Sequence, residues 1–515
     1  MKAQDYQISA EKFVFHETDG NMHDQKLETK PVTYFRDALH RFTRNKASIA
    51  AAVIILILFL FAFIAPILSP YEVKYADGYY RFMLPRNPIF YNAGIHFWDG
   101  GQEKEVNKAT YDLYKGIQEE IGREVIMTEP EVVSEVYMGK TRELYRFRFD
   151  TYNAIGMQFI ELNTAEYEAI QRYQDENGVQ VIYPITDPTL RPKSEQDETN
   201  ANIWYKTKVG AGRKTEIVYD KQGNFIPIYQ EANGKDNYFS TVLKEGDTKL
   251  YNYAQKMDGD YWRLRVDYRE YYIYKHAQLG DGIKQPLFIL GTTDSGQDIL
   301  TCLSSGARFS FILAICVSAV NLFVGAIYGS IEGYYGGKLD LIMERISEIL
   351  GSVPFMIVIT LLKYHFNVSH ALILFISFFL TGWVGMAART RMQFYRFKNQ
   401  EYVLVARTLG ANDRRIMFKH IFPNAIGTLI TGSVLVIPGV IFSETSLSYL
   451  GIIDLNTGTM TSVGTLLAKG NNFLLTYPHI VLFPAIFISL LMLSFNLFGN
   501  GLRDAFNPSL RGTED

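Results

Sequence analysis

Residues 47–68 constrain this chain more than any other segment, because they contain no Asp, Glu, Lys or Arg. A helix of about 20 apolar residues is long enough to cross a hydrocarbon core about 30 Å thick. Further apolar spans of this length occupy the second half of the chain, at 309–330, 339–362, 370–388, 425–443 and 479–501. The sequence therefore predicts an α-helical polytopic membrane protein with six transmembrane helices.

The first span, 47–68, is interpreted as an uncleaved anchor and as transmembrane helix 1. The segment 1–46 precedes it, which is a long leader for a signal peptide, and no small-residue cleavage site ends the span. We therefore expect 1–46 to remain attached as a soluble N-terminal segment.

Lysine and arginine near the span ends set the expected orientation. Basic residues precede the first span and fill the loop between spans four and five, whereas the short loops near Lys363 and Lys469 hold one each. By the positive-inside rule, the N-terminal segment 1–46 and the tail 504–515 both face the cytoplasm. The basic patches are explained by topology, and the formal net charge is only -3, so a nucleic-acid partner is not expected.

The section 71–289 has a different composition, polar and rich in tyrosine. Apolar and charged residues alternate over 145–149 and 262–268, which is typical of half-buried strands. Helical stretches are expected at 107–121 and 164–176, each followed by a glycine, and a hairpin at 215–219 and 225–230. Because this section joins an outward to an inward span, we expect an extracytoplasmic α+β domain inserted at 71–289.

The loop 401–424 is short, basic and amphipathic. Its first part carries an apolar stripe at helical spacing. The stripe consists of Tyr402, Val405, Ala406 and Leu409. Gly410 is expected to end this helix, and Asn412 with Asp413 to cap a second one. The small Ala406 and Gly410 would let a partner chain approach closely, so the loop predicts a surface offered to a cytosolic protein.

This loop resembles the EAA loop of binding-protein-dependent ABC transporter permeases of the dipeptide and oligopeptide subgroup. The positions that match are Glu401, Tyr402, Val403, Ala406, Arg407, Gly410, Ala411, Ile416, His420, Ile421, Pro423 and Asn424. Leu404 and Val405 depart from the pattern, where Glu and Ala are usual, and enlarge the expected docking face. Blocks at 290–308, 333–340, 446–451 and 496–508 resemble the same family, whereas most of 71–289 does not.

The resemblance implies a permease core over 290–503 with the fold of type I ABC importers, in the cytoplasmic membrane of a bacterium. It implies three kinds of partner besides membrane lipid: a second permease, two cytosolic ATP-binding subunits, and an extracytoplasmic substrate-binding protein. The residues expected to couple to the ATPase are Glu401, Tyr402, Ala406, Arg407, Gly410, Ala411, Ile416, His420, Pro423 and Asn424.

The implied cargo is a dipeptide or oligopeptide. Sibling permeases carry nickel chelates or oligosaccharides, so these cargoes stay open. A membrane sensor with an extracytoplasmic ligand-binding domain is a further alternative, although only 504–515 follows the last span. The section 71–289 would contact the binding protein or the second permease, or would be a decoration without a transport role.

Enzyme chemistry is not expected in this chain. The segment 210–215, GAGRKT, lacks the spacing of a phosphate-binding loop, and the nine histidines lack the spacings of metal ligands. We therefore expect no catalytic residue, cofactor or metal, and place ATP hydrolysis in the partner subunits.

Four glutamates near membrane depth raise the question of a proton relay. They are Glu332, Glu344, Glu348 and Glu444. Charge in a bilayer is costly and often functional. All four are expected near span ends, within reach of water, which favours structural or pore-edge roles over proton coupling.

Overall fold

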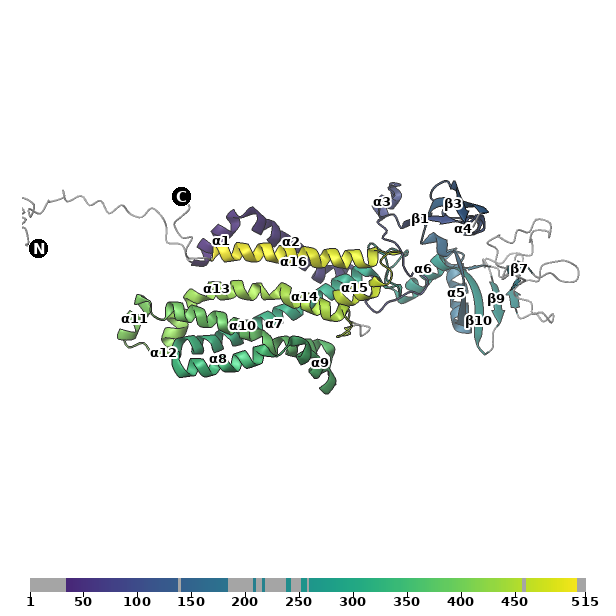
Figure 1. Ribbon diagram of the computed structural model, residues 1–515. Helices are drawn as coiled ribbons and strands as arrows, with labels where there is room; N and C mark the ends of the chain where they lie inside the picture. Colours follow the sequence, from purple (N-terminus) through teal and green to yellow (C-terminus); the bar gives the residue numbers. More distant parts are fainter. Residues whose placement is uncertain are drawn as a thin grey trace, which may run out of the picture.

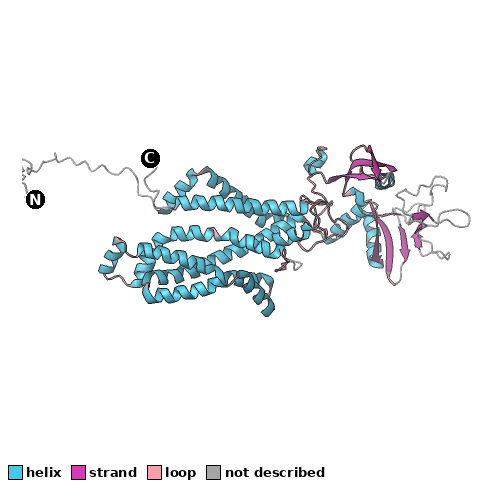
Figure 2. Ribbon diagram, viewed as in Figure 1, coloured by secondary structure: helices cyan, strands magenta, loops and turns pink. Residues whose placement is uncertain are grey.

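The computed structural model describes residues 34–137, 140–183, 207–209, 215–217, 238–241, 252–256, 259–455 and 460–506. Its long helices run side by side as a bundle, and strands extend from one end (Figures 1 and 2). The opposite end carries α11 (Glu401–Thr408). We call these two ends the sheet end and the α11 end.

Among the residues that the structure describes, five helices are long and apolar enough to cross a membrane. They are α2 (Lys46–Leu68), α7 (Ile299–Tyr335), α10 (His370–Phe397), the continuous stretch Asp413–Tyr449, and α16 (His479–Ala505). Short helices flank them: α1 (Tyr34–Arg44) precedes α2, and α15 (Val463–Asn471) precedes α16. The prediction of membrane-spanning helices is confirmed for these five.

The prediction that the third span, 339–362, is one continuous helix is wrong. The structure has α8 (Gly337–Ser352) and α9 (Phe355–His365), which meet at an angle of 73°. Val353 and Pro354 between them are extended, with ψ of 121° and 126°. Proline lacks an N–H and disfavours helical geometry in the residue before it, so the helix breaks there. The pair counts as a sixth span only if the bent unit crosses as one.

Several helices are longer than their apolar spans. The expected span 309–330 lies within α7, which runs from Ile299 to Tyr335, and 370–388 lies within α10. Hydropathy marks only the part that fits a bilayer, whereas helix ends are set by caps. In α7 the cap is Asp298, whose carboxylate accepts a hydrogen bond from the Thr301 N–H at 2.9 Å.

Glycines let α7 and α10 lie against each other. A Cβ at Gly329 would lie 2.1 Å from the carbonyl oxygen of Ala387, so no larger residue fits. Gly325 and Gly333 face the backbone of α10 in the same way, with carbonyl oxygens 2.8 and 2.7 Å from the Cβ position. These three glycines therefore allow the two helices to pack tightly.

The corner between α7 and α8 is built by Gly336 and Gly337, whose φ angles are +67° and +60°. Beside it, Arg391 of α10 donates hydrogen bonds to Asp340 and Glu344, both at 2.7 Å. The Arg391 Nε also lies 3.4 Å from the carboxylate of Glu332 in α7, so this network joins three helices at the α11 end.

Two of the four glutamates are buried, so the expectation that water reaches all four is wrong. Glu332 is 2% exposed and Glu444 is fully buried. The Glu444 carboxylate accepts hydrogen bonds from Ser310 at 2.7 Å and Ser448 at 3.0 Å. A sequence shows how far a residue lies along a helix, whereas the packing of α7 and α14 (Val436–Tyr449) decides which face turns inward.

Residues 69–298, which we call the α2–α7 segment, form three antiparallel sheets in the described part, the smallest of which is the pair β6 (Thr207–Val209) and β7 (Thr215–Ile217). In the first, β3 (Lys140–Asp150) lies between β1 (Gly101–Val106) and β2 (Glu131–Tyr137), with Gly101 opposite Asp150. The second has the order β4-β10-β9-β8, and β5 also pairs with β10. Its strands are β4 (Met157–Asn163), β5 (Ile182–Tyr183), β8 (Tyr238–Thr241), β9 (Asn252–Lys256) and β10 (Tyr261–Asp267).

Helices cover the two larger sheets. Side chains of α4 (Lys108–Ile121) pack on Val106, Phe147 and Phe149. The second sheet buries Leu264 and Val266 in one cluster with side chains of α5 (Thr164–Asn177) and α6 (Tyr268–Leu279). Apolar residues on alternate strand positions thus face helices.

Most elements expected in this segment are confirmed. The helices at 107–121 and 164–176 correspond to α4 and α5, which end at Gly122 and Gly178 in left-handed geometry. The alternating stretches lie in β3 and β10, although Tyr268 begins α6 instead of ending the strand. Of the expected hairpin, Thr215–Ile217 is strand β7 and pairs with β6 (Thr207–Val209); its other arm, 225–230, lies outside the described residues.

The α2–α7 segment leaves the bundle and returns to it at one place. The Arg86 N–H donates to the Phe288 carbonyl oxygen at 3.1 Å. Before that point, Phe82 stacks on Tyr477 with ring centroids 4.6 Å apart, and the Thr292 hydroxyl accepts from the Met83 N–H at 2.8 Å. Residues 69–86 and 287–298 therefore pack as part of the sheet end of the bundle.

Candidate coupling site

The glycine turn expected in 401–424 is present. α11 ends at Thr408, and Gly410 has a φ of +81°. The Ala411 N–H donates to the Ala406 carbonyl oxygen and the Gly410 N–H to that of Arg407, both at 3.0 Å. This pair of bonds is a Schellman motif, which requires a left-handed residue and therefore favours glycine.

The second helix begins where it was expected and then widens. The Asn412 side chain accepts a hydrogen bond from the Arg415 N–H at 2.9 Å, which caps α12 (Asp413–Arg415). A π-helical turn follows over Ile416–Ile421 and leads into α13 (Phe422–Val434). The coupling candidate is thus continuous with a membrane-spanning helix.

A compact apolar cluster fixes this helix pair to the bundle. Val403 of α11 and Ile416 of the π turn are fully buried, together with Phe394 of α10. The cluster also contains Tyr334 from the end of α7, and Met417. A displacement of α11 therefore presses directly on the ends of α7 and α10.

Hydrogen bonds reinforce the same contacts. The Tyr334 hydroxyl donates to the Asp413 carboxylate at 2.6 Å, and Lys398 donates to the Gly333 carbonyl oxygen at 2.9 Å. Asn424 donates to the Tyr402 hydroxyl at 3.3 Å. Burial raises the pKa of Tyr402 above its ordinary value, so the phenol is protonated at neutral pH.

The apolar stripe divides between an inner and an outer face. Leu409 is 82% exposed, Val405 56% and Tyr402 40%, whereas Ala406 is 8% exposed and faces the protein's own core. The expectation that Ala406 makes room for a partner is therefore wrong, because Ala406 and Val403 form the buried side of α11. Leu404, at 47%, joins the outer face.

The structure brings the predicted coupling residues together, but in three different settings. Ala406 and Ile416 are buried, and Ala411 and His420 are partly buried. The other six are exposed: Glu401, Tyr402, Arg407, Gly410, Pro423 and Asn424. We call the exposed apolar side chains Tyr402, Leu404, Val405 and Leu409 the α11 face.

Sequence reasoning missed the residues that support the site from behind. Tyr334 and Phe394 hold the cluster and the Asp413 contact, and both lie in long helices. The family-like block at 333–340 contained a signal for Tyr334, whereas Phe394 had none. Within the described ranges, no group of three or more His, Cys, Asp or Glu residues is placed to hold a metal ion.

Two family models match this chain. "Binding-protein-dependent transport system inner membrane component" matches residues 321–512, and "N-terminal TM domain of oligopeptide transport permease C" matches residues 33–85. The first range includes the whole candidate coupling site. The second ends one residue before Arg86, where the α2–α7 segment leaves the bundle.

Named relatives also align with this chain. The oligopeptide transport system permease protein OppC of Bacillus subtilis is 42% identical over 221 residues, which covers 43% of this chain and 72% of the relative. The dipeptide transport system permease protein DppC of Lactococcus lactis is 37% identical over 298 residues, 56% of this chain and 83% of the relative.

Among solved structures, the MetNI methionine ABC transporter in inward-facing conformations aligns at 13% identity and a TM-score of 0.32, over 40% of this chain and 96% of that chain. At that score the likeness has no weight in the assignment. The assignment rests on the family models and on relatives matched over more than two thirds of their length. The chain therefore belongs to the binding-protein-dependent transport system inner membrane components, which are helical, multi-pass membrane permeases.

Proposed function

We propose that this chain is one permease subunit of an ATP-driven peptide importer with the type I fold, and that it forms the translocation path with a second permease. The α11 face is the observation that carries this proposal. Exposed apolar side chains beside arginines, on a helix backed by a rigid core, suit docking into a groove of another protein. The names of the relatives support dipeptides or oligopeptides as cargo.

The coupling element would work as a lever. Two cytosolic ATPase subunits would bind the α11 faces of the two permeases and move them when ATP closes the ATPase dimer. The cluster of Val403, Ile416, Phe394 and Tyr334 would pass that movement to α7 and α10. The π turn would pass it to α13, because both belong to one continuous helix. This chain would contribute coupling and passage, and its partners the hydrolysis.

Charge supports an orientation with the α11 end in the cytoplasm. Arg407, Arg414, Arg415 and Lys419 are all exposed there. Both α1 and the end of α16 lie at the same end of the bundle (Figure 1). By the positive-inside rule, the termini would be cytoplasmic and the sheets would lie outside.

For the α2–α7 segment, we propose an inserted extracytoplasmic α+β domain that contacts the substrate-binding protein. Three observations support an insertion: the family match ends at residue 85, Arg86 and Phe288 are hydrogen-bonded neighbours, and the sheets between them have their own cores. Its position on the side where substrate would arrive favours a docking role.

The coupling proposal is tested by placing a charge on the α11 face. Leu409→Asp changes an exposed side chain, so the chain itself should fold, but the carboxylate would be desolvated in the ATPase groove. We expect the ATPase subunits to bind at least about tenfold more weakly, about 1.4 kcal/mol, in pull-down titrations. Leu279→Asp, on a leucine 62% exposed at the end of α6, is the matched control. Unchanged ATPase binding and uptake in Leu409→Asp would refute α11 as the docking element.

A further inference from the structure

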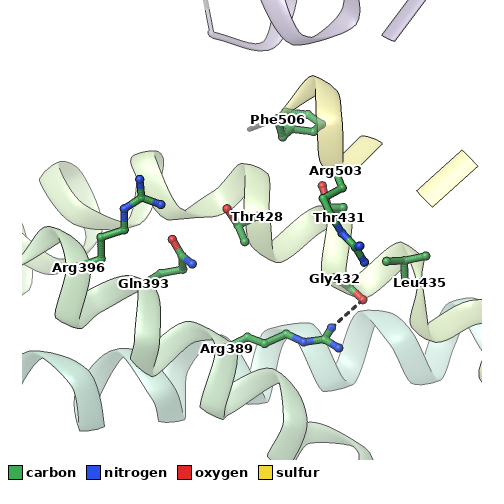
Figure 3. A pocket seen from close by; sticks show the side chains of 9 residues that line it. All are labelled: Arg389, Gln393, Arg396, Thr428, Thr431, Gly432, Leu435, Arg503 and Phe506. Atoms are coloured by element: carbon green, nitrogen blue, oxygen red, sulfur yellow. Dashed lines mark hydrogen bonds between the residues drawn. The ribbon is translucent and has the colours of Figure 1, made fainter. Parts of the chain in front are cut away.

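A basic cavity lies between α10, α13 and α16 at the α11 end, apart from the α11 face. Its volume is about 330 Å³. Figure 3 shows the residues that line it. They are Arg389, Gln393, Arg396, Thr428, Thr431, Gly432, Leu435, Arg503 and Phe506. Three arginines thus line one cavity whose walls include no acidic side chain.

These arginines differ from their neighbour Arg391. Arg391 is neutralised by Asp340 and Glu344. Arg389, Arg396 and Arg503 form no ion pair with any residue in the described ranges. The positive-inside rule accounts for basic residues at this end, but it does not require that they share one cavity without a counter-charge. An anion in the cavity would supply that counter-charge.

Backbone contacts hold Arg389 in place. Its Nη1 donates to the Gly432 carbonyl oxygen at 3.2 Å, and a Cβ at Gly432 would lie 2.8 Å from that same nitrogen. In Figure 3 Arg503 points toward Gly432 from the other side. The absence of a side chain at Gly432 therefore leaves room for the Arg389 guanidinium. Arg389 of α10 and Arg503 of α16 both point toward this glycine (Figure 3).

The remaining lining suits a phosphate group attached to an apolar tail. The Thr428 hydroxyl is exposed in the wall, and the Gln393 Oε1 is buried without a partner among the described residues. Turning that amide by 180° would present N–H donors instead. Guanidinium groups bind phosphate oxygens in bidentate fashion, and Leu435 with Phe506 adds apolar wall.

We propose that this cavity binds the phosphate of an anionic phospholipid headgroup in the inner leaflet. Basic pockets between membrane helices on the cytoplasmic side are suited to such headgroups. The inference rests on the proposed orientation, in which the α11 end is cytoplasmic. A lipid held here would brace α13 against α16, next to the helix that continues from the coupling site.

The experiment uses the complete complex of this chain with its partner subunits. Native mass spectrometry would compare retention of phosphatidylglycerol and phosphatidylcholine. We expect the wild type to retain phosphatidylglycerol preferentially, and the double variant Arg389→Gln/Arg503→Gln to lose about tenfold or more of that affinity. Gly432→Ala, which keeps every charge but displaces Arg389, should also weaken retention. Arg36→Gln/Arg44→Gln, two exposed arginines of α1, is the charge-matched control.

Equal retention in the wild type and the cavity variants, or an equal loss in the control, would overturn the proposal. Equilibrium binding of radiolabelled inorganic phosphate distinguishes a lipid headgroup from free phosphate as the ligand of the cavity. If free phosphate binds and phosphatidylglycerol does not, the cavity takes soluble phosphate and the lipid assignment is wrong. Co-purification of ATPase subunits with each variant shows that the complex has assembled. Lipid retention is read without transport, so its failure would leave the proposed import function standing.

Discussion

Trp98 of the α2–α7 segment stacks on Phe483 of α16, with ring centroids 5.6 Å apart and an angle of 27° between the rings. Trp98 has a φ of +59°, and so does Phe82, which stacks on Tyr477. A left-handed backbone costs a non-glycine residue about 1–2 kcal/mol. Both strained aromatic residues thus fasten the segment to the sheet end of the bundle, where ring packing offsets the strain.

Trp98→Ala should loosen this attachment. The stacked pair contributes about 0.5–1.5 kcal/mol beyond the area that it buries. We expect faster limited proteolysis within 88–98 with no change in α16. Ile95→Ala, on a side chain of the same stretch that is 48% exposed, is the control. Equal proteolysis in the wild type and Trp98→Ala would contradict a fastening role.

Gly329→Ala should disrupt the packing of α7 on α10. Its Cβ would meet the Ala387 carbonyl oxygen, so the helices must separate, at a cost of about 1–3 kcal/mol. The amount of complex that survives heating should fall, as measured by size-exclusion chromatography. Gly385→Ala in α10 is a matched change, because nothing lies within 4 Å of its Cβ position. If both variants lose similar amounts of complex on heating, the close approach of α7 and α10 at Gly329 is not the cause of the loss.

Gly410→Asp should uncouple ATP hydrolysis from uptake, because it places a carboxylate beside the α11 face. The turn has a φ of +81°, so strain must be separated from charge. Gly410→Asn makes that separation, since Asn and Asp both tolerate left-handed geometry. We expect Gly410→Asn to retain most uptake and Gly410→Asp to lose it while ATP is still hydrolysed. Equal behaviour of the two variants would assign the effect to the backbone.

Deleting 87–286 and joining Arg86 to Leu287 with a few residues should leave a complex that assembles. The Arg86 nitrogen and the Phe288 carbonyl oxygen are already 3.1 Å apart, so a short linker can join the two ends, although the deletion removes the Trp98–Phe483 stacking. We expect the affinity of the complex for the substrate-binding protein to fall. Unchanged uptake at limiting binding protein would favour the decoration alternative. The wider deletion 74–285 removes Phe82 and should destabilise the bundle as well.

Acid should weaken the first sheet through Asp99. Burial alone would raise its pKa, but hydrogen bonds from Arg148 and from the Gly101 N–H outweigh burial and hold the pKa below its ordinary value of 3.8. A lowered folded-state pKa adds stability above 3.8 that is lost as pH falls through the folded value.

Asp99→Asn tests, at neutral pH, whether the ionised Asp99 carboxylate stabilises the first sheet. Leaving Arg148 without its buried partner should cost about 3–5 kcal/mol. Hydrogen exchange of β1 and β3 should then accelerate, and the difference from the wild type should shrink below pH 3.8. Glu103→Gln, on an exposed side chain of β1, is the control. A difference that persists unchanged in acid would exclude the Asp99 carboxylate as its cause.

Elements that depend on local chemistry could be predicted from the chain. Asn107 with Gly122 bounds α4, and Gly410 supplies the left-handed turn after α11. Both follow from capping geometry, which acts within a few residues. The helix break at Pro354 is equally local. It lies inside an apolar run, so hydropathy predicts one continuous helix there.

Hydropathy, motif and alternation are properties of neighbouring residues, so the chain alone predicts the five membrane helices, the family-like coupling loop, and the strands and helices in the described part of 71–289. The faces that turn inward depend on packing between distant helices. This packing buried Glu444 and Ala406, set Tyr334 and Phe394 behind the coupling site, and brought Arg389 and Arg503 to one cavity. These outcomes depend on how distant helices rotate and cross, which is settled by packing over the whole bundle.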